Sequence, residues 1–185
     1  MSILNKAIGG YFELELPPSI QGKYQDALKY QSARAAFLAL LRFKSPSRVW
    51  MPHYICESML APLKALNIEI CFYSLDANFG IADEITLDGN DLLLYVNYFG
   101  VCIQQCDALL LRFCPEQIVL DCSQAFYAPL RDCYASVYSP RKFFGIPDGG
   151  LLLTESQINP PEVLDVGSED RMQHLIKRLG GSVEE

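Results

Sequence analysis

Short runs of apolar residues recur along the chain and predict the strands of a sheet. The runs cover residues 48–51, 68–75, 91–97, 118–121, 135–139 and 150–154. They are continuous rather than alternating, and strands covered on both faces of a parallel sheet have this pattern. Six such strands with helical segments between them predict a layered α/β domain with a mostly parallel sheet.

Three other segments have the composition of helices. Residues 32–43 contain Ala, Leu, Phe and Arg without Gly or Pro, and Ser32 is placed to cap the amino end. Residues 57–66 are predicted to be helical because Pro62 falls early in the segment, where it is less damaging. The chain then becomes polar toward its end, and residues 171–179 are predicted to form a connecting helix with one apolar face.

Polar side chains follow four of the predicted strands. These segments are Pro52-His53-Tyr54, Asn97-Tyr98-Phe99-Gly100, Asp121-Cys122-Ser123-Gln124 and Ser139-Pro140-Arg141-Lys142. Ligands of open parallel sheets bind beyond the carboxyl ends of the strands, where the loops converge. The sequence therefore predicts that four strand ends contribute to one crevice.

Two charged residues at these ends have two interpretations each. Asp121 closes an apolar run, and it is either a turn or cap residue or the partner of a cation such as a protonated pyridine nitrogen. Lys142 precedes Phe143 and Phe144. It is either a surface lysine or an amine that apolar surroundings keep neutral and nucleophilic for Schiff-base chemistry.

A helix start and a pair of glycines leave two interpretations, a phosphate site and ordinary local structure. Residues 32–34 begin a predicted helix, and they either cap it or bind a phosphate through N–H groups and a hydroxyl. Gly149 and Gly150 predict a turn. Pro17 and Pro18 favour an extended or turn conformation.

Composition excludes several classes of function. The chain has 185 residues and a net charge of -7, and its basic residues are scattered, so nucleic-acid binding is not expected. No apolar run approaches the ~20 residues of a membrane span, and no secretory signal is evident. The seven cysteines are odd in number and form no CxxC pair, which predicts reduced, buried thiols, Cys56 included, in a cytoplasmic protein.

Motifs of other enzymes are missing from the sequence. His53 and His174 have no Asp or Ser at a spacing that suggests a triad, and Ser123 is not in a GxSxG motif. No GxGxxG or Walker-type run follows a strand, which disfavours an unrelated nucleotide-binding module.

Six segments in order resemble the DegT family of sugar aminotransferases. They are residues 30–36, 50–56, 96–100, 121–126, 138–145 and 148–150, within a resemblance that runs from about residue 9 to 155. The most specific parts are Asp-x-x-Gln, at Asp121 and Gln124, and Ser-x-x-Lys, at Ser139 and Lys142.

The resemblance implies the three-layer large domain of a fold-type-I transferase that depends on pyridoxal 5'-phosphate. Residues 1–158 would form this cofactor-binding domain, and residues 159–185 would form a linker and the start of a helix leading to a small domain. Family members continue for about as many residues again, so the chain is expected to be a shortened form with little turnover. A homodimer is also implied, because the family builds its sites at a subunit boundary.

The resemblance also implies a role for each matched residue. Lys142 would carry the cofactor covalently, Asp121 would pair with the pyridine nitrogen, and Gln124 would contact the 3-hydroxyl side of the ring. The phosphate would be held by Ser139 and by the residues at the helix start, which are Ser32, Ala33 and Arg34. Many members have an aromatic residue in place of Cys56 and a glycine in place of Ala33. Tyr54 or another side chain would therefore stack on the ring.

The implied reaction is transfer of an amino group, usually from glutamate, to a keto-sugar attached to a nucleotide. The substrates are thus a nucleotide-sugar and an amino acid. The alternative is a protein of the same fold that catalyses nothing and acts as a binding or structural domain. Adding pyridoxal phosphate and looking for a visible absorbance band separates both from an unrelated nucleotide-binding module.

Overall fold

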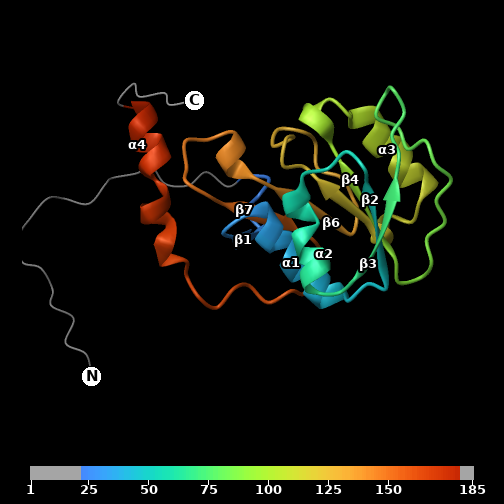
Figure 1. Cartoon of the computed structure of the whole chain (residues 1–185), viewed down its shortest axis with the longest axis horizontal. Helices are drawn as coiled ribbons and strands as arrows, with labels where there is room; N and C mark the ends of the chain where they lie inside the picture. The colour runs from blue at the N-terminus through green and yellow to red at the C-terminus, as the bar shows by residue number, and fades with distance from the viewer. Residues whose placement is uncertain (1–21, 180–185) are drawn as a thin grey trace, which may run out of the picture.

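The computed structural model describes residues 22–179, which form a seven-stranded mixed sheet with flanking helices (Figure 1). The predicted extended segment at Pro17 and Pro18 lies outside these residues. The strand order is β1-β7-β6-β5-β4-β2-β3. The strands are β1 Leu28–Tyr30, β2 Arg48–Pro52, β3 Glu69–Tyr73, β4 Leu92–Val96, β5 Ile118–Asp121, β6 Ala135–Tyr138 and β7 Gly150–Leu153.

The centre of the sheet is parallel, as the sequence predicts. Strands β3, β2, β4, β5 and β6 pair in parallel, whereas β7 is antiparallel to both β6 and β1. Every residue of β4, β5 and β6 is buried, so both faces of the sheet are covered there. The predicted three-layer α/β class is therefore confirmed, while the three-residue strand β1 is too short to have been recognised from its pattern.

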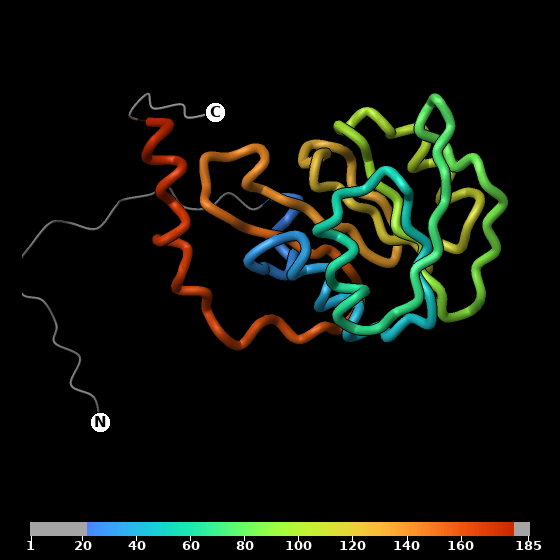
Figure 2. The backbone as a smooth tube through the Cα atoms, viewed as in Figure 1, coloured from blue at the N-terminus to red at the C-terminus, as the bar shows by residue number. Residues whose placement is uncertain are grey.

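Four α-helices and five 3₁₀ helices connect the strands of the described part of the chain. The α-helices are α1 Ala33–Lys44, α2 Ala61–Ala65, α3 Ile103–Arg112 and α4 Gln173–Leu179. The 3₁₀ helices are η1 Glu57–Met59, η2 Tyr98–Gly100, η3 Pro115–Gln117, η4 Pro140–Lys142 and η5 Val166–Arg171. Helices α1 and α2 pack against each other, and Figures 1 and 2 show them in front of the sheet.

Helix α1 follows the prediction closely. The Ser32 hydroxyl caps it by accepting a hydrogen bond from the Ala35 N–H at 3.2 Å. One face, which includes Phe37, Leu40 and Leu41, is buried against the sheet. The helix ends at Ser45, whose backbone is left-handed. This rigid, capped helix directs its amino end toward the site described below.

The predicted helix at residues 57–66 is divided in two. Helix η1 ends at Met59 and α2 begins at Ala61, with Pro62 in its first turn. Proline has no N–H to donate, which is tolerated in a first turn but not within a continuous helix. The break before Pro62 is the physical consequence.

Strand β3 departs from the expectation of burial on both faces. It lies at the sheet edge, where β2 is its only partner within the described chain. Glu69 is exposed, and so is Phe72, whose ring stacks on His53 with centroids 5.1 Å apart. A continuous apolar run identified the strand correctly, but it did not reveal the edge position.

The last described segment leaves the sheet and then contacts the loop that precedes β7. Arg171 of η5 pairs with Asp148, nitrogen to oxygen 2.6 Å, and also with Asp165. The Ser168 hydroxyl donates to the same Asp148 carboxylate at 3.0 Å. Helix α4 forms two residues later than predicted and lies to one side of the body in Figure 2. It exposes Ile176 and Leu179, while Leu175 is half-buried.

Three further findings concern membranes, thiols and metal ions. No helix within residues 22–179 has the length and apolar character needed to cross a membrane. All seven cysteines are free, but Cys56 and Cys114 are exposed, so the prediction of uniformly buried thiols is wrong. No group of three His, Cys, Asp or Glu side chains in the described part of the chain is arranged to hold a metal ion.

Candidate functional site

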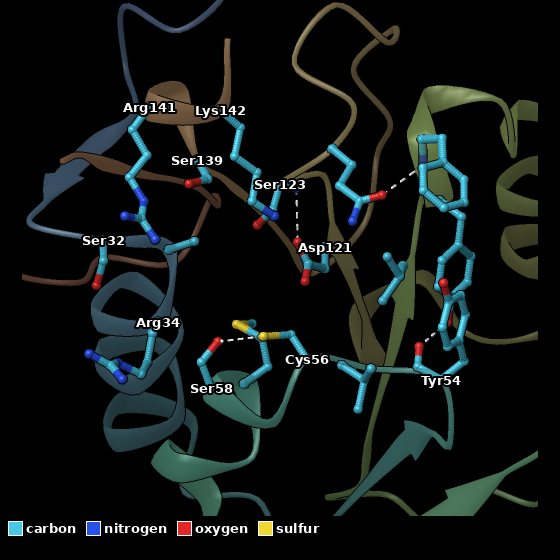
Figure 3. Close-up of a pocket in the computed structure, with 17 residues that line it drawn as sticks. Ser32, Arg34, Tyr54, Cys56, Ser58, Asp121, Ser123, Ser139, Arg141 and Lys142 are labelled. Atoms are coloured by element: carbon cyan, nitrogen blue, oxygen red, sulfur yellow. Dashed lines mark hydrogen bonds between the residues drawn. The ribbon is translucent and has the colours of Figure 1, made fainter. Parts of the chain in front are cut away.

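A cavity of about 430 Å³ lies where the carboxyl ends of the parallel strands meet the amino end of α1 (Figure 3). Asp121 ends β5, Ser139 follows β6, and Tyr98 lies just beyond β4. The cavity is lined by all eight residues singled out in the sequence, namely Ser32, Ala33, Arg34, Tyr54, Asp121, Gln124, Ser139 and Lys142. The structure thus brings them together, while their chemical roles stay predictions.

The amino end of α1 is fixed in place by two glycines of the sheet. A Cβ atom on Gly150 would lie 2.1 Å from the carbonyl carbon of Ser32 and 2.5 Å from the Ala33 nitrogen. Gly149, at φ 125°, donates its N–H to the Gln31 carbonyl at 2.8 Å. The sequence predicted only a turn at these glycines; the close approach to α1 requires Gly150, whereas the positive φ requires Gly149.

Ala33, where the DegT family that the sequence resembles usually has glycine, fits the backbone without strain. It is the first residue of α1, is buried, and does not have the positive φ that would call for glycine. The N–H of the next residue, Arg34, has no acceptor within residues 22–179. An amide of the first helical turn therefore remains able to donate to an anion in the cavity.

Asp121 combines the two interpretations that the sequence left open. Its side chain is a turn residue, because Oδ1 accepts the Ser123 N–H at 2.8 Å, and it is also a wall of the cavity. It is only 5% exposed, and burial raises the pKa of this carboxyl, an effect that the Ser123 hydrogen bond and the Lys142 charge oppose. The Ser123 side chain also hydrogen-bonds to this carboxylate, which lines the cavity, where a cationic or donor group would face it.

Gln124 joins two of the strand-end loops. Its Oε1 accepts the Phe99 N–H at 3.1 Å, and Phe99 has a left-handed backbone with φ 54°. Because an N–H can only donate, the amide oxygen must face Phe99, and the Gln124 Nε2 group remains a free donor among the described residues.

Lys142 is not in the apolar surroundings that the sequence suggested. Its side chain is exposed at the cavity and points toward Asp121 and Ser123 in Figure 3. Phe143 and Phe144 turn away and pack on Phe126, with ring centroids 5.6 and 5.0 Å apart. The neighbouring aromatic residues therefore build the loop rather than desolvate the amine.

Tyr54 is 60% exposed and already has an aromatic partner. Its ring stacks on Tyr98 with centroids 5.4 Å apart, and the Tyr98 hydroxyl donates to the Tyr54 carbonyl at 2.7 Å. Phe79 stacks on Tyr98 in turn, at 5.0 Å. An aromatic ladder thus forms one side of the cavity, with Tyr54 at its exposed end.

Cys56, Ser58, Ser123 and Arg141 also line the cavity but were not predicted as site residues. The expectation that Cys56 is a buried thiol is wrong, because it is exposed and its Sγ lies 3.1 Å from the Ser58 hydroxyl oxygen. That hydrogen bond lowers the pKa of the thiol, and the Lys142 charge contributes. Arg141 and Ser123 are sequence neighbours of predicted residues, and this adjacency was the available signal.

Comparison with known proteins gives matches in structure and none in sequence. No protein-family model matches the chain, and no curated protein sequence matches it significantly. The sugar aminotransferase CalS13 from Micromonospora echinospora superimposes with a TM-score of 0.56 and 17% identity, over 84% of this chain and 45% of that one. NtdA from Bacillus subtilis, with bound cofactor PMP, gives a TM-score of 0.57 and 15% identity over 71% of this chain and 33% of that one.

A third match is an Escherichia coli GDP-4-keto-6-deoxy-D-mannose-3-dehydratase with bound hydrated PLP. Its TM-score is 0.55 and its identity 16%, over 71% of this chain and 40% of that one. The chain therefore shares its fold with these three proteins and spans less than half the length of each. At these identities the likeness establishes a shared fold.

Proposed function

We propose that the chain binds pyridoxal 5'-phosphate and belongs to an aminotransferase that acts on a nucleotide-linked keto-sugar. The observation that carries the proposal is the convergence, in one cavity, of Lys142, Asp121 and Ser139 with the amino end of α1. The residues present fit this cofactor. A buried carboxylate that lines the cavity suits a protonated ring nitrogen, an exposed amine suits the aldehyde, and a helix amino end suits the phosphate.

Each residue then has a defined task at a defined atom. When bound, pyridoxal phosphate supplies an electron sink that makes loss of a proton from the substrate carbon easier. The Asp121 carboxylate would hold the ring nitrogen protonated, since that positive charge would offset the burial that raises the pKa of the carboxyl. Gln124 Nε2 would donate to the ring oxygen, since its Oε1 is held by Phe99. Lys142 Nζ would hold the cofactor and would accept the proton that leaves the substrate carbon.

The amino donor is proposed to be glutamate and the acceptor a nucleotide-linked keto-sugar. Supporting this substrate class, the solved structures that share the fold include a sugar aminotransferase and a nucleotide-sugar dehydratase. The assembly is proposed to be a homodimer, which agrees with the exposed aromatic side chains of Tyr54 and Phe99 at the rim of the cavity. Light scattering at micromolar concentration tests the dimer.

The central test is covalent capture. The wild-type chain mixed with pyridoxal phosphate should develop a visible absorbance band that borohydride bleaches, and peptide mass spectrometry should locate the adduct on Lys142. Lys142→Ala should abolish the single-site adduct. Lys64→Ala, which removes an exposed amine on α2, should leave it unchanged.

A second measurement separates catalysis from binding. Glutamate-dependent amination should be assayed over a panel of nucleotide-linked keto-sugars. Adduct formation on Lys142 without turnover would favour the alternative of a binding or structural domain, whereas a specific adduct in Lys142→Ala would refute the assignment of the amine.

A further inference from the structure

Arg141 is a cation at the cavity for which the described residues offer no counter-ion. Its side chain is exposed, lines the cavity, and takes part in no hydrogen bond or ion pair within residues 22–179. In Figure 3 its guanidinium extends past Ser139 toward the first turn of α1. The Ser139 hydroxyl and the amides at the helix start, which are the other predicted phosphate-binding groups, are neutral, although the Arg34 side chain also lines the cavity.

The electrostatics of this corner favour an anion. The amino end of an α-helix carries a partial positive charge, and α1 has no acidic residue in its first turn. A guanidinium beside that end is repelled unless negative charge lies between them. The N–H of Arg34 also calls for a hydrogen-bond acceptor here, because no described residue accepts a hydrogen bond from it.

Ser139 provides an independent indication of a ligand. It is only 4% exposed, its hydroxyl makes no hydrogen bond to any described residue, and it lines the cavity next to Arg141. The Ser139 oxygen is not one of the unpartnered side-chain atoms of the described residues that are sealed from solvent, so it opens onto the cavity and can donate to a ligand there. A ligand oxygen in the cavity would supply the partner.

We propose that Arg141 is a phosphate-binding residue, and that its guanidinium, the Ser139 hydroxyl and the Arg34 N–H together hold a phosphomonoester dianion. The guanidinium supplies full charge and paired donors, whereas the serine and the amide supply only neutral donors. That the phosphate is the cofactor's own rests on the proposed function. A free phosphate or the phosphate of another ligand shares the same chemistry.

The experiment measures dissociation constants for pyridoxal phosphate, for pyridoxal and for inorganic phosphate. Wild type is compared with Arg141→Ala, Arg141→Lys and Arg42→Ala, the last removing an exposed arginine from the opposite end of α1. Arg141→Ala should weaken pyridoxal phosphate binding about tenfold to a hundredfold, the equivalent of one charge-assisted hydrogen bond. It should leave pyridoxal binding unchanged, Arg141→Lys should recover part of the loss, and Arg42→Ala should match wild type.

The outcomes distinguish this inference from the proposed function. Suppose that wild type binds pyridoxal phosphate. If Arg141→Ala binds it equally well, or if Arg141→Ala loses affinity for pyridoxal by the same factor as for pyridoxal phosphate, the assignment of Arg141 is wrong and the proposed function stands. If wild type forms no adduct with pyridoxal phosphate, but inorganic phosphate raises its melting temperature and not that of Arg141→Ala, the phosphate site stands and the cofactor assignment fails.

Discussion

Replacing Gly150 with alanine should separate the sheet from the amino end of α1. The added Cβ would lie 2.1 Å from the Ser32 carbonyl carbon and 2.2 Å from its oxygen, whereas ordinary contact begins near 3.4 Å. Both partners are backbone atoms, so no side-chain rotation relieves the clash and the strand must move by more than about 1 Å. Overpacking costs about 1–3 kcal/mol, and we expect a loss near 3 kcal/mol here.

The assay is urea and thermal denaturation of Gly150→Ala beside Gly145→Ala. A Cβ on Gly145 would meet nothing within 4 Å, so this control carries the same change in chain entropy and should stay within about 0.5 kcal/mol of wild type. A loss of 3 kcal/mol lowers the melting temperature of a domain of this size by about 6–12 °C. Equal stability of the two variants would show that the close approach of β7 to α1 is not a constraint on the fold.

Two other predictions concern ionisable groups at the cavity. Burial raises the pKa of Asp121, so the native state keeps a proton that the unfolded chain has lost, and stability falls as pH rises through that window. Asp121→Asn should therefore be more stable than wild type at pH 7 without cofactor, as measured by urea denaturation; lower stability would contradict this. Among the exposed thiols, Cys56 should react with iodoacetamide faster than Cys114 at pH 7, because the Ser58 hydrogen bond lowers the pKa of Cys56 while the Glu116 hydrogen bond raises that of Cys114. Peptide mass spectrometry over time checks the order, and faster labelling of Cys114 would refute it.

Local signals predicted the central elements because those elements depend on few neighbours. The run Leu92–Val96 is apolar at every position, and a strand of that kind is stable only where helices cover both faces. Ser32 caps α1 through a hydrogen bond to Ala35, three residues along the chain. Burial and capping of this kind can therefore be predicted from short stretches of sequence.

Other features escaped prediction because they depend on partners distant in the chain. The edge position of Glu69–Tyr73 follows from strand order, which the apolar pattern of a single strand does not encode. Phe143 and Phe144 appeared able to desolvate Lys142, but Phe126 provides them with a packing surface elsewhere. Cys56 is exposed at the cavity although cysteines are usually buried, and its residue type alone did not reveal this.

The sequence by itself determined which side chains stand at the ends of the strands, Asp121 and Ser139 among them. Parallel strands place their carboxyl ends at one edge of the sheet, so the type of sheet was enough to bring such residues near one another. Only the tertiary structure decided in which directions these side chains point. The approach of Gly150 to Ser32 joins positions far apart in the chain, and it sets the direction of α1. Arg141 and the Ser139 hydroxyl line the same cavity because of that packing. The orientation of the two side chains is set by backbone contacts that no local sequence pattern specifies.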